Sequence, residues 1–339
     1  MLLKSYTIYY LFTLLLIFFC LPFAIQAQEV LGVHILHPAE ISDAAKLIKN
    51  EFNTDSWSYV TLPLSLNDLD KHHEWQTAFN YAKEKKINPL IRFVTRFDPD
   101  KNAWAIPTRG EIMSYFTFLN QLDWPDEKRY LIIFNEPNHF SEWGGVSDPA
   151  SYAEILSFTA DWAHTENENY RVLPAAMDLA APNGSTTTEA FTYLNAMFAA
   201  QPDVFTKIDY WNSHSYPNPA FSAPANRTGQ NSLRGFTYEL AWLAEKTNLT
   251  PKVFITETGW TENTRTKRHL FNYYAYANEH IWSDERIMAV TPFILKGDPG
   301  PFTHFSLIDQ HGQPKLQYDA LAEIIKKNSQ ANQIEISDF

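Results

Sequence analysis

Residues 130–138 of the chain read YLIIFNEPN, and this stretch indicates the fold. An apolar run of this length that ends in turn-forming residues is typical of a buried strand in a parallel sheet. Pro137 cannot donate a hydrogen bond to a sheet and favours an extended backbone at Glu136, so the strand is expected to end there. Asn135 and Glu136 then lie at its C-terminal tip, where a carboxyl group needs a partner or a chemical task.

A second stretch has the same pattern. Residues 251–260 read PKVFITETGW, in which an apolar run ends at Glu257 and Gly259 breaks the strand. Two strands that each deliver one glutamate at the C-terminal end are therefore the main functional signal of this sequence.

The chain alternates between strand and helix patterns on both sides of these two stretches. Eight apolar segments predict strands, and helical periodicity or a capping pattern predicts a helix after each of them. The predicted strands cover residues 30–36, 57–64, 88–96, 130–138, 170–178, 207–217, 251–260 and 287–296. Eight such units predict a (β/α)8 TIM barrel in a single α/β domain. The structural alternative is a doubly wound open sheet, which often carries a glycine-rich phosphate loop that this sequence lacks.

The first 27 residues have a different composition. Lys4 is the only charged residue before Glu29, residues 8–23 are almost entirely apolar, and small residues follow. This pattern predicts a secretory signal peptide over residues 1–27, and the stretch is short for the alternative, an uncleaved membrane anchor. With this signal peptide the mature chain would be secreted, periplasmic or extracellular. Cys20, the only cysteine, lies in the signal peptide, so the mature chain would contain no disulfide.

The remaining chain is acidic and long enough for a large core. The sequence has 339 residues, 45% of them hydrophobic, and a formal net charge of −12. This charge argues against nucleic acid or an anionic membrane as a partner and fits a neutral substrate. We expect a monomer, with a catalytic domain over residues 28–328 and a frayed polar tail over residues 329–339.

In a barrel of this kind the active site lies at the C-terminal ends of the strands. Two glutamates that face each other across the barrel mouth are typical of glycoside hydrolysis, in which one acts as general acid and the other stays ionised. The other polar or aromatic residues at predicted strand ends are Arg92 or Arg96, Asn135, Asp178, His214, Tyr216, Trp260 and Lys296.

Three motifs together resemble glycoside hydrolase clan A, whose members are retaining (β/α)8 enzymes that act on β-linked sugars. They are Asn135-Glu136-Pro137 on the fourth strand, His214-Ser-Tyr216 on the sixth and Glu257-Thr-Gly-Trp260 on the seventh. The resemblance covers the whole mature chain in strand order. It implies an exported retaining β-glycosidase that binds a poly- or oligosaccharide and needs no cofactor.

The resemblance also implies a role for individual residues. Glu136 would be the acid/base and Glu257 the nucleophile of a double displacement. Asn135 would hydrogen-bond the sugar hydroxyl next to the anomeric carbon. Tyr216 would donate to Glu257, and His214 would orient the same cluster. The expected substrate-binding residues are therefore Asn135, His214, Tyr216, Trp260, Arg92 and Trp143.

The sequence differs from the usual clan pattern at one basic residue of the second strand. The clan usually has an arginine late on the second strand, near the nucleophile, and residues 59–63 contain none. Arg92 or Arg96 on the third strand could reach the same carboxylate, or Thr61 could leave it without a cation. The missing arginine favours an alternative function, a carbohydrate-binding or scaffold barrel that has lost turnover. A transglycosylase is a second alternative, because a sugar can replace water as the acceptor.

The aromatic residues of the barrel mouth leave several assignments open. The clan tends to have Trp at the end of the eighth strand, for which Phe293, Phe302 or Phe305 could substitute. Trp104 and Trp143 lie in predicted loops, where stacking on sugar rings and packing are equally plausible. We expect the loops over residues 98–108, 140–146 and 218–234 to determine where along a polysaccharide the enzyme cuts.

Two histidines on the first strand raise the question of a metal. His34 and His37 are three residues apart, which puts them on opposite faces of a strand, and no further ligand pattern accompanies them. We therefore predict no metal site. Asp178 is left open between a role in the site and a salt bridge.

Overall fold

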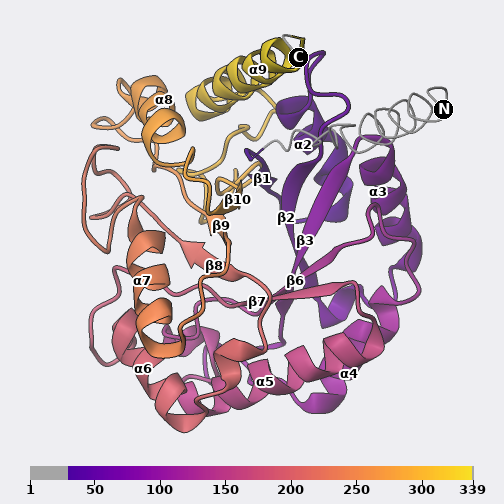
Figure 1. Ribbon diagram of the computed structural model, residues 1–339, viewed down its shortest axis with the longest axis vertical. Coiled ribbons are helices and arrows are strands. Elements are labelled where there is room, and N and C mark those ends of the chain that lie inside the picture. The colour runs from indigo at the N-terminus through magenta and orange to yellow at the C-terminus, as the bar shows by residue number, and fades with distance from the viewer. Residues whose placement is uncertain (1–29, 338–339) are drawn as a thin grey trace, which may run out of the picture.

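The computed structural model describes residues 30–337, so the predicted signal peptide lies outside the described residues. Within that range, eight parallel strands alternate with eight helices, and Figure 1 shows the helices around the strands. This arrangement confirms the predicted (β/α)8 fold. In chain order the elements are β1 (Val33–His34), α2 (Ile41–Ile48), β2 (Ser58–Ser65), α3 (His72–Glu84), β3 (Ile87–Val94), α4 (Arg109–Leu119), β6 (Arg129–Ile133), α5 (Pro149–Glu166), β7 (Tyr170–Pro174), α6 (Ala190–Ala200), β8 (Trp211–His214), α7 (Gly235–Thr247), β9 (Val253–Glu257), α8 (Leu270–His280), β10 (Ile287–Val290) and α9 (Leu316–Ser337).

The strands form two parallel sheets whose edges meet. One sheet has the order β1-β2-β3-β6-β7 and the other the order β10-β9-β8. Isolated bridges join the edges, between Leu31 and Val290 on one side and between Asp178 and His214 on the other. The hydrogen-bond ladder is therefore discontinuous at two places, but all eight strands run in the same direction. Their C-terminal ends consequently lie at one end of the barrel, where the predicted site residues lie.

An aromatic cluster fills the inside of the barrel. Successive residues of a strand point to opposite faces, so one set of side chains meets the helices and the other meets the barrel axis. The rings of Tyr59, Tyr130 and Phe254 lie with centroids 5.2–5.9 Å apart. They pack with Leu90, Ile132, Leu173 and Ala289. This cluster accounts for part of the high aromatic content and supports the site from below.

Two boundaries differ from the sequence prediction. Helix α9 continues to Ser337, so the expected frayed tail from Ser329 is wrong: Ser329 is buried and its hydroxyl donates to the Ile325 carbonyl at 2.8 Å. Strand β8 ends at His214, three residues before the predicted end. The backbone turns there because the N–H of Tyr216 donates to the carbonyl of His214 at 3.1 Å.

A short hairpin extends from the predicted loop after β3. Its strands are β4 (Phe97–Asp98) and β5 (Ala103–Trp104), which pair antiparallel. The 3-10 helix η3 (Phe140–Glu142) follows β6 and packs against this hairpin. No helix within residues 30–337 is both long and apolar enough to span a membrane.

Candidate active site

The tip of β6 has an unusual backbone. Phe134 has φ 70° and Glu136 has φ 25°, values that non-glycine residues rarely adopt. Such residues cost on the order of 1–3 kcal/mol each and persist where the surrounding structure holds them. The prediction of an extended backbone before Pro137 is therefore wrong. The turn is closed by the N–H of His139, which donates to the carbonyl of Glu136 at 2.8 Å.

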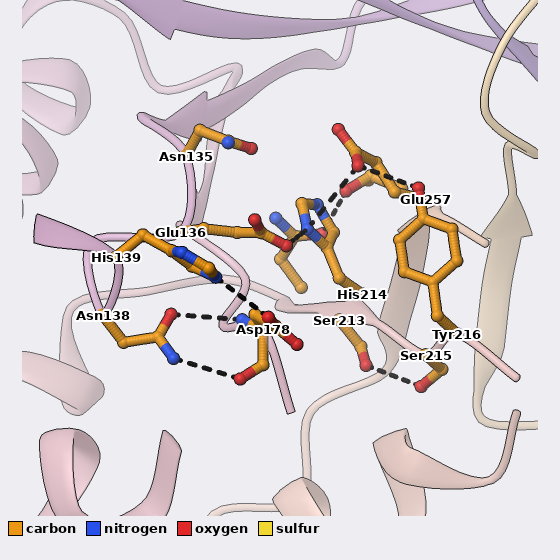
Figure 2. Close-up of polar contacts among 12 residues, drawn as sticks. Asn135, Glu136, Asn138, His139, Asp178, Ser213, His214, Ser215, Tyr216 and Glu257 are labelled. Atoms are coloured by element: carbon orange, nitrogen blue, oxygen red, sulfur yellow. Dashed lines mark hydrogen bonds and ion pairs between the residues drawn. The ribbon is translucent and has the colours of Figure 1, made fainter. Parts of the chain in front are cut away.

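His214 lies between the two glutamates. Its Nδ1 is 2.7 Å from Oε1 of Glu136 and 3.8 Å from Oε2 of Glu257. Dashed lines mark these contacts in Figure 2. An oxygen of Glu136 and an oxygen of Glu257 lie within 4.8 Å of each other. Carboxyl groups about 5–5.5 Å apart are typical of retaining glycosidases, whereas inverting enzymes separate them by about 6.5–9.5 Å. The spacing therefore suits a mechanism that retains anomeric configuration.

Glu257 is buried and surrounded by donors. The guanidinium of Arg92 contacts Oε1, and the Tyr216 hydroxyl donates to Oε2 at 3.0 Å. Nδ1 of His34 lies 3.7 Å from Oε1. Burial by itself opposes ionisation, but His214 and Arg92 outweigh it and hold the pKa of Glu257 well below the usual range of a glutamate. Glu257 is consequently an anion, and its carboxylate is held in position by Arg92 and Tyr216.

Arg92 supplies the cation that the second strand lacks. In the parallel ladder it lies opposite Pro63 of β2, and it also donates to Oδ1 of Asn135 at 3.0 Å. Arg96, the other candidate, is exposed and pairs with Glu111 at 2.8 Å instead. The third strand thus contributes the positive charge, and the same guanidinium orients the Asn135 amide.

The two buried histidines next to Glu257 differ in charge. Burial would lower the pKa of His214, but Glu257 and Glu136 outweigh it and raise that pKa above its usual value. Burial, helped by Arg92, lowers the pKa of His34 to about 3, although Glu257 opposes the shift. The His34 ring is therefore neutral, whereas the environment of His214 favours its protonated form.

Within residues 30–337, Glu136, His214 and Glu257 form the group whose spacing would suit a metal ion. Both oxygens of Glu257 already accept hydrogen bonds, from Arg92 and from Tyr216. A metal ion would have to compete with the Arg92 guanidinium for this carboxylate. The donor set therefore suits proton and glycosyl transfer better than metal binding.

Asp178 belongs to a network that joins β6 to β7. Its carboxylate accepts from Nε2 of His139 at 2.9 Å. The Asn138 side chain bonds both the carbonyl and the N–H of Asp178, at 3.0 and 3.1 Å (Figure 2). Of the two readings left open by the sequence, the structure favours the salt bridge, which fixes the loop that carries Glu136.

Two tryptophans predicted to bind substrate are buried in the structure. Trp260 is 0% exposed, and its indole N–H donates to the Ala223 carbonyl at 2.9 Å. Trp143 is also 0% exposed and packs against Phe134 and Tyr152, with ring centroids 5.6 and 5.1 Å away. Neither ring has surface to offer a sugar, so both predictions are wrong. Each fills the space between a strand-end loop and a neighbouring helix.

A pocket of about 260 Å³ adjoins the catalytic cluster. Its walls include Arg92, Asn135, Glu142, Trp104 and Phe302. Trp104 and Phe302 are part of this wall, together with the buried Phe93 and Phe134. Phe293 lies behind, edge-on to Phe302 with centroids 5.0 Å apart, and is 7% exposed.

Glu142 is the pocket residue that sequence reasoning missed. Burial and the neighbouring Glu136 raise the pKa of Glu142 to about 7, although Arg92 and Asn135 oppose the shift. It lies in a loop six residues after Glu136, and an acidic loop residue usually reads as a solvated turn. Only the fold of η3 brings it to the site.

A fourth carboxyl lies behind the site and does not reach it. Glu239 of α7 is 0% exposed and accepts from the Ser213 hydroxyl, which lies 2.8 Å from the Ser215 hydroxyl. Burial raises the pKa of Glu239 to about 7, although the Ser213 hydrogen bond opposes the shift. A glutamate in an unfolded chain has a pKa of about 4.3.

These two pKa values predict that the effect of Glu239→Gln on the free energy of unfolding depends on pH. Because the folded pKa is raised, the stability that Glu239 contributes is fully present below about pH 4.3 and is lost as pH rises through 7. Glutamine cannot titrate, so the variant should gain on the order of 2–3 kcal/mol relative to wild type between pH 5 and pH 8. Denaturant unfolding at both pH values measures this. An equal difference at both pH values contradicts the prediction, and Glu154→Gln, at an exposed residue paired with Arg109, is the control.

Known structures share the fold of this chain. No protein-family model matches the sequence, and no curated protein matches it. The GH39 enzyme from Xanthomonas axonopodis pv. citri has 13% identity and a TM-score of 0.58 over 88% of this chain and 66% of that chain. The endo-β-1,4-glucanase Xac0029 of the same organism has 15% identity and a TM-score of 0.55 over 88% and 99%. Xylanase 10B from Thermotoga maritima has 14% identity and a TM-score of 0.52 over 89% and 96%.

At this level of identity the comparison bears on the fold. The neighbours are (β/α)8 glycosidases, so the predicted barrel is confirmed, and the resemblance to clan A that the three motifs indicate agrees with their class.

Proposed function

We propose that this protein is a retaining β-glycoside hydrolase that cleaves a poly- or oligosaccharide. The observation that carries the proposal is the pair Glu136 and Glu257, with oxygens within 4.8 Å at the mouth of the barrel. The ionised state of Glu257 supports it, because a nucleophile must be an anion when the substrate binds. The similar structures of an endo-β-1,4-glucanase and a xylanase support a β-linked polysaccharide as the substrate class.

The reaction proceeds in two displacements. In the first, a Glu257 oxygen bonds to the anomeric carbon while the bond to the leaving oxygen breaks and Glu136 gives that oxygen its proton. In the second, Glu136 takes a proton from water, the water oxygen bonds to the anomeric carbon, and Glu257 leaves as a carboxylate. Arg92 and Tyr216 hold Glu257 in position through both steps, because each bonds one of its oxygens.

His214 and Asn135 support the other half of the reaction. His214 contacts Glu136 at 2.7 Å and keeps its carboxyl directed at the leaving oxygen. The oxygen of the Asn135 amide is held by Arg92, and the amide NH₂, which also hydrogen-bonds Glu142, has a second N–H for a sugar hydroxyl. The mechanism requires no cofactor.

The two alternatives differ in what they require. The binding or scaffold barrel was favoured by a missing arginine, and Arg92 on Glu257 removes that argument. A transglycosylase shares the glycosyl-enzyme, so products formed in the presence of acceptor sugars distinguish it from a hydrolase. We further propose that the protein is exported, because of the pattern in residues 1–27, and acts as a monomer.

Trapping of the intermediate tests the proposed function. The protein is incubated with a panel of 2-fluoro β-glycosyl fluorides, and the intact mass and peptide masses are then measured. The fluorine at C2 slows both displacements, but fluoride is a good leaving group and keeps the first one fast. The glycosyl-enzyme therefore accumulates, and a stable adduct is expected on Glu257. The reactive panel member identifies the sugar. An adduct on another residue, or no adduct with any gluco-, manno-, xylo- or galacto- reagent, contradicts the proposal.

A further inference from the structure

The pocket beside the Glu136–His214–Glu257 cluster is lined by one acid that has no cationic partner of its own. Glu142 lies on η3, and the charged group opposite it in the pocket wall is Arg92, which is engaged with Glu257 and Asn135. Within residues 30–337, Glu142 forms no ion pair. The Asn135 amide hydrogen-bonds this carboxyl, but one neutral partner leaves a part-buried carboxyl with acceptor sites unused.

Hydrogen bonds of the backbone hold Glu142 and Trp104 on the same wall. The N–H of Gly144 donates to the carbonyl of Trp104 at 2.7 Å, which ties the segment after η3 to the β4–β5 hairpin. The N–H of Glu142 donates to the carbonyl of His139 at 3.0 Å, which ties η3 to the loop that carries Glu136. A flat apolar ring and a carboxyl acceptor therefore share a rigid wall, a combination that fits the apolar face and the hydroxyl edge of a sugar ring.

The pocket lies on the side of the sugar that becomes bonded to Glu257. Arg92 and Asn135, the partners of the nucleophile and of the adjacent sugar hydroxyl, form part of its wall. Glu136, which must face the leaving oxygen, lies outside the lining and toward His214. The pocket is therefore open to the sugar that is transferred, or to the next unit on that side.

Acidic groups outnumber basic groups around the pocket. Glu136, Glu142 and Glu257 are the acidic groups of the cluster, and Arg92 and His214 are the basic ones, both engaged with the catalytic carboxyls. A uronic acid would bring another carboxylate next to Glu142 without a free cation to receive it. The hydroxyl groups of a neutral sugar can instead donate to Glu142.

We propose that Glu142 is a specificity-determining residue, which accepts hydrogen bonds from the hydroxyl groups of a neutral sugar lying on Trp104 and excludes uronic acids. The inference rests on the proposed function and adds a substrate class to it, namely neutral β-linked oligosaccharides.

Binding of defined oligosaccharides tests this role without depending on turnover. Calorimetry on the full-length wild-type, Glu142→Gln, Glu142→Ala and Glu154→Gln proteins is carried out with cello-, laminari-, manno- and xylopentaose and with β-1,4-linked pentamers of glucuronate and mannuronate. Wild type should bind at least one neutral pentamer and neither uronate. At pH 8, above the raised pKa of Glu142, Glu142→Ala should weaken the neutral ligand about 10- to 100-fold, since hydrogen bonds to a charged group are lost. Glu142→Gln keeps the shape, so it should weaken the neutral ligand less and gain about 10-fold for a uronate of the same linkage.

The outcomes separate this inference from the proposed function. If Glu142→Gln changes the affinity for neutral and acidic pentamers equally, Glu142 acts through structure alone and the inference is overturned. Binding that depends on Glu142 in a protein that traps no glycosyl intermediate supports this inference and contradicts the proposed hydrolase. A wild-type protein that binds none of the neutral pentamers overturns it as well. Glu154→Gln should match wild type, because its carboxyl pairs with Arg109 at the exposed surface.

Discussion

Glu257→Ala should reduce kcat/KM for any substrate by about 10⁴-fold or more, because the variant has no group to form the glycosyl-enzyme. The loss should be similar for good and poor leaving groups, since both displacements pass through Glu257. Added azide can enter the vacated space and attack the anomeric carbon from the nucleophile's face. The expected product is therefore the α-glycosyl azide, which nuclear magnetic resonance identifies by its anomeric coupling.

The variant must be shown to fold before its activity is interpreted. Arg92 is 8% exposed and loses its carboxylate partner in Glu257→Ala, so a lower Tm is expected while the circular dichroism spectrum stays native. Glu257→Gln keeps the volume and a hydrogen-bond acceptor for Arg92, and should be inactive with a smaller loss of Tm. Glu154→Gln makes the same chemical change at an exposed residue and should keep wild-type activity. Turnover by Glu257→Gln within tenfold of wild type would falsify the assignment of the nucleophile.

Glu136→Ala should have the second-largest effect, and its size should depend on the leaving group. For a natural oligosaccharide the loss of the general acid should cost about 10²- to 10⁴-fold in kcat. A dinitrophenyl glycoside needs no proton to leave, so its first displacement should proceed and the glycosyl-enzyme should accumulate. Azide can attack that intermediate without a general base, so it should restore turnover and give the β-glycosyl azide.

The two azide products assign the two carboxyls independently of rate. An α product from Glu257→Ala and a β product from Glu136→Ala agree with the proposed roles, and the reverse pattern would exchange them. Equal losses for dinitrophenyl and oligosaccharide substrates in Glu136→Ala, without azide rescue, contradict the acid/base role. Arg92 remains next to Glu257 in this variant, so the pKa of the nucleophile stays low.

The barrel could be predicted because its signals are local. Each buried strand is an apolar run with a turn signal at its end, and each helix has its own periodicity, so residues 130–138 and 251–260 reveal their strands without any partner. Because all strands of a parallel sheet run in the same direction, their C-terminal tips lie at one end. This is why Glu136, Glu257, His214 and Tyr216 could be grouped from the sequence.

The errors concern side chains whose environment depends on loops. Trp143 and Trp260 have the composition of sugar-binding residues, but the neighbouring loop and helix surfaces cover them completely. Trp104, in a similar predicted loop, is carried by the β4–β5 hairpin to the pocket wall. A tryptophan gives the same sequence signal in both settings, because exposure is a property of the packed loops.

The sequence by itself determined the class of fold, the two carboxyls and the order of the strands that carry them, since each follows from a pattern within ten or so residues. Only the tertiary structure decided which cation reaches Glu257, that Glu142 enters the pocket, and that the pKa of His34 is lowered while that of His214 is raised. The physical reason is that ion pairing, desolvation and pocket shape depend on atoms brought together from distant parts of the chain. Arg92 and Glu257, for example, are 165 residues apart and share one buried contact.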